Sequence, residues 1–186
     1  MKAVEAAKTS DQIQRIEMAL SDNHGQVYAD LWKIGLNLAL RISDLLQLTY
    51  DDVSGEKLKI VEGKTKKLRE IVINKNARVV IERRRQDHPD HIYLFQSDSN
   101  RSKKMQKPID RSVVSRKFKE VGEQNSIRLH LNTHSMRKTR GWMMHQAGVS
   151  IEQICKVLNH SSPAVTMAYI GITQADIDRT YDEFCL

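Results

Sequence analysis

The sequence of 186 residues has two cysteines, Cys155 and Cys185, which are too few for a disulfide framework. It has no apolar run of membrane-spanning length, and Met1-Lys2 leads into no signal-peptide core. We therefore expect a soluble cytoplasmic protein without a membrane partner. It also lacks a Walker loop and a cluster of acids suited to magnesium, so no nucleotide, metal or other cofactor is expected.

Positive charge is abundant instead, with a formal net charge of +7. Cations gather at 64–69, 83–85, 101–107 and 111–119, whereas acids outnumber cations over 171–186. Such a chain suits a polyanionic partner, although any one basic run is equally explained as a solvated surface. The acidic C-terminal segment is expected to dock on protein rather than on a polyanion.

Hydrophobic periodicity predicts a mostly helical chain. Thr9 and Gln12 form a capping-box pattern before a first helix, and a strongly periodic second helix over 27–38 should carry Arg41 at its C-terminal end, with Ser43 capping a short helix to Leu48. Segments 58–61 and 69–73 predict two strands joined by a turn at 62–67. Further helices are expected at 74–86, 111–124, 134–147, 151–159, 163–170 and 174–184, with a loop at 97–108. The expected class is mainly α with one small antiparallel sheet (α+β), as a single domain over 1–186.

Six polar residues spread along the chain have the chemistry needed to break a phosphodiester without a metal ion. They are Arg41, Lys64, His134, Arg137, His160 and Tyr169. Arginine forks clamp non-bridging oxygens and neutralise charge on phosphorus. A tyrosine hydroxyl can attack that phosphorus, and a lysine or histidine can protonate the departing oxygen.

Three segments around these residues resemble the motif boxes of the tyrosine recombinases, the phage integrase family. They read LRISDLLQL at 40–48, THSMRKT at 133–139 and LNHSSPAVTMAY at 158–169. The resemblance runs from about residue 10 to the end and implies the catalytic-domain fold of that family. It also implies a bacterial or phage-encoded, nucleoid-associated, site-specific DNA recombinase or integrase that needs neither metal nor ATP.

The first box and the predicted hairpin carry part of the implied site. In the family, the arginine matching Arg41 holds the scissile phosphate, and an acid at the Asp44 position supports the site. A lysine on the mobile hairpin turn protonates the leaving 5′ oxygen. Lys64 follows Gly63 and is the chosen candidate, with Lys66 and Lys67 as alternatives.

The second and third boxes carry the remainder. The resemblance gives Arg137 a second phosphate clamp, His134 the role of proton acceptor and His160 a hydrogen bond to the phosphate. Tyr169 is the implied nucleophile, which forms a 3′-phosphotyrosine. We expect the neighbouring cations to lower the pKa of this phenol, and we expect His134 and Arg137 to project from one face of a helix. Lys138 stands where many members have histidine.

The resemblance also implies partners. The expected partner is double-stranded DNA, bound by a homotetramer on two duplexes through the segment after Tyr169. The apolar side chains of that segment would pack on a neighbour or, equally, on their own domain. The expected DNA-binding residues are Lys66, Lys67, Arg111, Arg116, Lys119, Lys138 and Arg140. The family's N-terminal core-binding domain, which completes a clamp on DNA, is absent from the chain, so accessory DNA-bending proteins are expected.

Other interpretations remain open from the sequence. The chain is either the catalytic part of a longer protein or a short single-domain recombinase. A DNA-binding regulator of the same fold without turnover is one alternative function, and a type IB topoisomerase is another. Zinc held by His130, His134 and Cys155 is conceivable, but the site lacks a fourth ligand at the usual spacing.

Overall fold

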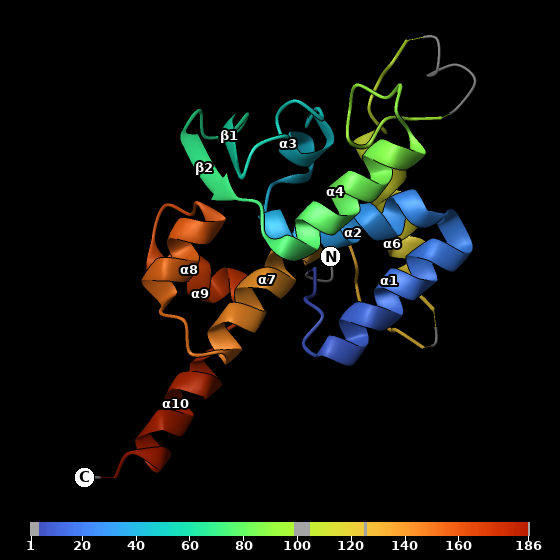
Figure 1. The fold of residues 1–186 in the computed structure, drawn as a ribbon. Coiled ribbons are helices and arrows are strands. Elements are labelled where there is room, and N and C mark those ends of the chain that lie inside the picture. Colours follow the sequence, from blue (N-terminus) through green and yellow to red (C-terminus); the bar gives the residue numbers. More distant parts are fainter. Residues whose placement is uncertain (1–3, 99–104, 125, 186) are drawn as a thin grey trace.

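The computed structural model describes residues 4–98, 105–124 and 126–185, and it confirms the expected class. The described chain is mostly helical with one two-stranded antiparallel sheet (Figure 1). Its elements are α1 (Ser10–His24), α2 (Gln26–Leu38), α3 (Ile42–Leu46), β1 (Lys57–Val61), β2 (Leu68–Val72), α4 (Lys75–Asp87), α6 (Arg111–Gly122), α7 (Ser135–Gln146), α8 (Ile151–Leu158), α9 (Pro163–Ile170) and α10 (Gln174–Glu183). Half of the predicted 97–108 loop, including Arg101, Lys103 and Lys104, lies outside the described residues.

The N-terminal cap differs in one bond from the predicted capping box. Thr9 caps α1, and its hydroxyl accepts from the Gln12 amide at 3.1 Å. The Gln12 carboxamide, however, accepts from the amide of Lys8 at 2.7 Å. The side chain of Gln12 therefore binds the backbone N–H of Lys8, one residue before the cap, instead of the N–H of Thr9 that a capping box would use.

Two hydrophobic clusters hold the described chain together. The larger includes buried side chains of α1, α2, α4 and α6, and the smaller joins Ala39 to Ile154, Leu158 and Ile170. The helices α2 and α7 connect them at Gly35, where a Cβ atom would lie 2.1 Å from the Met136 sulfur. This close approach sets the next residue, Arg137, against the C-terminal end of α2.

The expected position of Arg41 at a helix C-terminus is wrong, as is the expected cap at Ser43. The helix α2 ends at Leu38 because Ala39 adopts a left-handed conformation with φ 50°, and its N–H bonds to the Gly35 carbonyl. Arg41 is then the N-cap of α3, and Ser43 lies inside that helix. The position of the Arg41 side chain is therefore set by the turn at Ala39 between α2 and α3, and not by the last turn of α2.

The hairpin forms as predicted, with Leu58 opposite Ile71 and Ile60 opposite Arg69. Side chains alternate between the two faces of a strand, so Leu58 and Ile60 point inward. Glu62 continues the alternation and is fully buried. Backbone hydrogen bonds from Glu62 to Lys67 and from Lys66 to Glu62 close the turn.

The C-terminal helix α10 projects away from the rest of the described chain (Figure 1). It has no buried residue, and Ile177, Tyr181 and Phe184 are 42%, 77% and 72% exposed. Of the four side chains of the expected apolar stripe, Ile172 packs on its own domain against the smaller hydrophobic cluster, whereas the other three lie exposed. The alternative that the stripe packs on its own domain therefore holds for Ile172 and is wrong for Ile177, Tyr181 and Phe184. None of the helices in the described ranges is long and apolar enough to cross a membrane.

Candidate active site

Tyr169 lies near the end of α9, which begins at Pro163 and is capped by the Ser162 hydroxyl. The Tyr169 hydroxyl is 3.4 Å from Nδ1 of His134 and donates to the His134 carbonyl at the same distance. The Tyr169 ring meets that of His160 edge to face, with centroids 4.7 Å apart. Tyr169 thus contacts two other predicted site residues, His134 from the second box and His160 from the third.

Arg137 is buried, only 2% exposed, and joins two helix ends. Its guanidinium donates to the carbonyls of Ala39 and Leu158, at the ends of α2 and α8. His134 lies at the N-cap of α7, partly exposed at the surface and partly enclosed by its neighbours. Both side chains nevertheless reach Tyr169, because His134 contacts its hydroxyl and Arg137 interacts with the same phenol. This agrees with the prediction that residues three apart at the start of this helix project from one face.

A small cavity of about 260 Å³ lies beside this group. It is lined by Arg41, Ile42, Ser43, Lys64, Arg111, Thr133 and His134. Three lining residues carry positive charge and none is acidic, so an anion is the favoured occupant. Lys64 is the hairpin lysine that lines it, and neither Lys66 nor Lys67 does.

Asp44, on α3, is hydrogen-bonded to the turn of the hairpin. It is 6% exposed, and its Oδ1 accepts from the amide of Gly63 at 3.0 Å. This bond fixes the backbone immediately before Lys64.

A buried carboxylate that the sequence interpretation missed lies at the centre of the site. Both oxygens of Glu62 are engaged, by Arg41, Arg69, Thr65 and Asn159. The period-two alternation of β1 is the signal that could have found it. Burial raises the pKa of Glu62, but hydrogen bonds from Arg69, Thr65 and Asn159 and the charge of Arg41 outweigh it and hold the pKa at about 2.

The pKa of Tyr169 is raised, contrary to the expectation of a stabilised phenolate. Burial raises it, and the opposing effects of Arg137 and Arg41 are smaller. Burial followed by the charges of Arg137 and other cations lowers the pKa of His134, and burial with Arg137 and Arg41 lowers that of His160 to about 4. At neutral pH the phenol therefore keeps its proton and both imidazoles are neutral. A neutral His134 is able to accept the phenol proton.

The expected DNA-binding residues fall in separate places. Lys67 and Arg140 line a larger cavity of about 720 Å³ with His160, and Lys66 is exposed on the turn. Lys138 lies over the Tyr169 ring at 5.2 Å.

Three cations of α6 complete the expected set. Arg111, its first residue, lines the small cationic cavity. The exposed Arg116 and Lys119 pair with Glu120 and Glu123 at 3.7 Å and 3.6 Å. Arg111 is thus the α6 cation that faces the candidate site.

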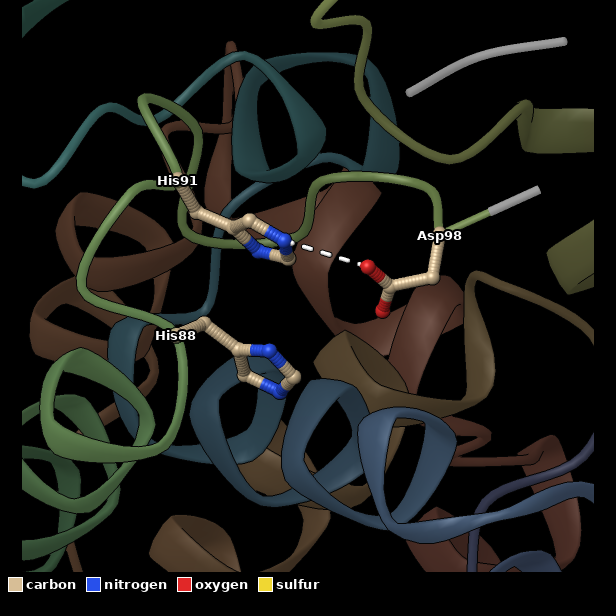
Figure 2. A group of neighbouring side chains, drawn as sticks. All are labelled: His88, His91 and Asp98. Atoms are coloured by element: carbon tan, nitrogen blue, oxygen red, sulfur yellow. Dashed lines mark hydrogen bonds and ion pairs between the residues drawn. The ribbon is translucent and has the colours of Figure 1, made fainter. Parts of the chain in front are cut away.

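The conceivable zinc ligands His130, His134 and Cys155 do not form a cluster. Within the described ranges, the group of three that comes close is His88, His91 and Asp98 (Figure 2). Asp98 lies 3.1 Å from His91, and the two imidazoles stack with planes 10° apart and centroids at 4.5 Å. A ring nitrogen binds metal through a lone pair in the ring plane, so two stacked parallel rings cannot direct both lone pairs at one ion. Burial lowers the pKa of His91, so as arranged these side chains form a hydrogen-bonded cluster with a neutral imidazole.

The fold and site together define a class: a mostly helical domain with a small antiparallel sheet, in which two arginines, two histidines and a tyrosine lie beside a cationic cavity. The chain matches the family model described as "Phage integrase family" over residues 8–175. It belongs to the phage integrase family, the tyrosine recombinases.

Curated relatives agree with this assignment. The "Probable integrase/recombinase YoeC" of Bacillus subtilis (strain 168) is 34% identical over 185 residues, covering 99% of this chain and 98% of that protein. The "Tyrosine recombinase XerC" of Caldanaerobacter subterraneus subsp. tengcongensis is 26% identical over 76% of this chain and 40% of its own length. The chain therefore spans nearly all of one relative and under half of the other.

Solved structures share the fold. XerA recombinase superposes with a TM-score of 0.73 at 18% identity, covering 98% of this chain and 65% of its own. A lambda integrase dimer bound to a COC′ core site gives a TM-score of 0.73 at 15% identity, covering 100% of this chain and 52% of its own.

Proposed function

We propose that this protein is a site-specific recombinase that cleaves and rejoins double-stranded DNA through a 3′-phosphotyrosine at Tyr169. The phenol oxygen attacks phosphorus and gives its proton to His134, and the bond to the 5′ oxygen breaks. Lys64 supplies the proton that leaves this strand with a free 5′ hydroxyl. The ester retains the bond energy, so the reverse reaction with another 5′ hydroxyl reseals DNA without ATP, and the step uses no metal.

The observation that carries this proposal is the position of the Tyr169 hydroxyl. It contacts His134, and His134 lines the cavity that also holds Arg41, Lys64 and Arg111. Preorganised cations beside a nucleophile stabilise the negative charge that develops on a phosphoryl transition state. Arg137 is buried beneath the same group and adds a further positive charge. A protein that only binds DNA has no use for this arrangement around the tyrosine.

The proposed assembly is a homotetramer on two duplexes. Lambda integrase structures are described as a dimer bound to a core site and a tetramer bound to a Holliday junction. In this chain, the exposed apolar stripe on α10 supplies the surface for a neighbour. We also propose that residues 1–186 act as one catalytic domain, helped by DNA-bending accessory proteins.

The decisive test is a covalent adduct. Nicked suicide duplexes from DNA flanking the gene are incubated with the protein, with EDTA and without ATP, and denatured in SDS. The wild type should form a stable protein–DNA adduct that Tyr169→Phe does not form. Tyr181→Phe, on the exposed α10, is the matched control and should form it at the wild-type rate.

Other outcomes favour other functions. Salt-sensitive binding without an adduct would indicate a DNA-binding regulator. An adduct together with relaxation at single sites, but no strand exchange, would indicate a topoisomerase. An adduct that persists in Tyr169→Phe would assign the nucleophile elsewhere.

A further inference from the structure

Glu62 is a carboxylate with no exposure to solvent, placed within the group of cations described above. Removing a carboxylate from water is costly unless charged partners and hydrogen bonds replace the solvent. Here Arg69 Nη1 donates to Oε1 at 2.7 Å, and the Thr65 hydroxyl donates to Oε2 at 2.8 Å. Arg41 and the Asn159 amide also donate to Oε2. Both carboxylate oxygens of Glu62 therefore accept hydrogen bonds, and two of the four donors are positively charged.

These partners come from three separate segments of the site. Arg41 begins α3, Thr65 and Arg69 belong to the hairpin that carries Lys64, and Asn159 is the left-handed C-cap of α8 directly before His160. Arg69 extends the link, since its Nη2 donates to the Val157 carbonyl in the last turn of α8 at 2.7 Å. One carboxylate thus fixes the relative positions of three segments that carry candidate catalytic groups.

The bond to Arg41 leaves that side chain competent to bind an anion. A guanidinium has five N–H donors, and within the described chain Glu62 is the acceptor that engages Arg41, through Nη1. Arg41 also lines the cationic cavity, where its other donors can meet a phosphate. Two arginines share the single carboxylate, so the pair of ion pairs keeps a net positive charge.

We infer that Glu62 is a positioning residue, which holds the Arg41 guanidinium in place for the scissile phosphate before DNA binds. This inference rests on the proposed strand-transfer function, because Arg41 is given its phosphate role there. Neither the motif boxes nor the six-residue set includes Glu62.

The first test compares two isosteric substitutions on the same hairpin. Glu62→Gln removes the buried charge, and Glu70→Gln makes the same change of net charge at an exposed residue paired with Lys57. At saturating DNA, Glu62→Gln should slow adduct formation by about 10- to 100-fold, the scale of a misplaced catalytic group. The Kd for DNA and the far-ultraviolet circular dichroism should match the wild type, and Glu70→Gln should leave the rate unchanged. A Glu62→Gln rate equal to that of Glu70→Gln would overturn the inference.

A double-mutant cycle tests whether Glu62 acts through Arg41. In an Arg41→Lys background, which has no fork to orient, Glu62→Gln should slow the reaction far less than it does in the wild type. Equal fold-losses in both backgrounds would mean that Glu62 acts by another route.

A third measurement separates this inference from the proposed function. Nitrogen-15 relaxation of the Arg41 guanidinium should report a restricted side chain in wild type and Glu70→Gln, and a mobile one in Glu62→Gln. If the wild type forms no adduct, the proposed function fails and this signal still decides the inference. Equal Arg41 order in all three proteins would overturn it.

A fallback variant covers the case in which Glu62→Gln does not fold. Thr65→Val removes one neutral donor to Glu62 and is measured in the same way. Slower cleavage with a more mobile Arg41 supports the inference, and no change overturns it.

Discussion

At the scale of single residues, burial dominates the protonation states of the candidate site. It raises the pKa of Tyr169 and lowers those of His134 and His160, because each charged form is disfavoured away from water. The resting site therefore pairs a neutral phenol with neutral imidazoles. A bound phosphate would bring negative charge beside His134 and His160 and favour their protonated forms, which suits the acceptance of a proton from Tyr169.

The lowered pKa of His160 makes stability depend on pH in a defined window. The folded protein has a pKa of about 4 there, against 6.5 when unfolded, so the unfolded chain binds more protons between these values. The contribution of His160 is complete above pH 6.5 and is lost as pH falls toward 4. The contribution is at most roughly 3.5 kcal/mol, since the two pKa values differ by about 2.5 and one pKa unit corresponds to about 1.4 kcal/mol.

Urea unfolding of wild type and His160→Asn at pH 7.5, 6, 5 and 4 measures this contribution. The free energy of unfolding should fall more steeply with acid in the wild type than in the variant. Parallel curves would contradict the assignment and place the pH dependence in other groups, such as His134.

Lys64 should act as the acid for the departing strand, and its neighbours on the turn should not. Lys64→Ala is expected to lower the cleavage rate by about 10²- to 10⁴-fold, the usual contribution of general acid catalysis. A substrate with a 5′-thiol leaving group needs little protonation and should restore the rate. Lys66→Ala and Lys67→Ala are the matched controls, and a larger loss in either would move the role to that residue.

At the scale of elements, the site is built from ends and turns. Arg41 begins α3, His134 caps α7, Asn159 ends α8, and Lys64 occupies the hairpin turn. Because these positions belong to different elements whose ends lie close together, their side chains converge on one site. The helix α10 is different, because it places an apolar stripe on an acidic segment where the described chain gives it no cover.

Changing the α10 stripe should alter assembly without altering the fold. Tyr181→Asp and Phe184→Asp change residues that are 77% and 72% exposed, so the free energy of unfolding should stay within about 0.5 kcal/mol of the wild type. Electrophoretic mobility with two duplexes should show loss of the higher-order DNA complex. Glu183→Gln, on the same helix, is the control and should retain it. A large drop in stability would show that α10 packs on its own domain in solution.

At the scale of the whole molecule, two hydrophobic clusters meet at α2 and α7, and the candidate site lies at this junction. Arg137 crosses it by donating to the ends of both α2 and α8. A net charge of +7 gives the protein a general attraction to polyanions. The same charge makes binding sensitive to salt, since each phosphate contact releases counterions.

Titration against salt should separate the cations of α6. Lys119→Ala should weaken binding to all duplexes alike and lower the slope of log K against log salt by about 1. Arg116→Ala should cost about 1–3 kcal/mol more on the DNA that forms the adduct than on unrelated DNA, as expected for base reading. Equal losses of binding free energy on the two DNAs would mean that Arg116 is a phosphate contact only.

Arg111→Ala should also slow cleavage, because Arg111 lines the cavity with Arg41 and Lys64.

Local order was predictable from the chain by itself. Helix periodicity, the cap at Thr9 and the hairpin all depend on residues a few positions apart. The family motifs and the excess of positive charge also belong to the sequence, and they identified the residues that the fold brings together. The exit of α2 was misjudged because nothing local predicted that Ala39 would adopt a left-handed conformation.

The tertiary structure alone decided burial and partnership between distant residues. Asn159 reaches Glu62 across 97 positions, and Arg137 reaches Ala39 across 98. Burial of Tyr169 reversed the expected direction of its pKa, because desolvation outweighs the arginines nearby. Such effects follow from how elements enclose a group, and sequence spacing carries no record of the solvent that folding removes.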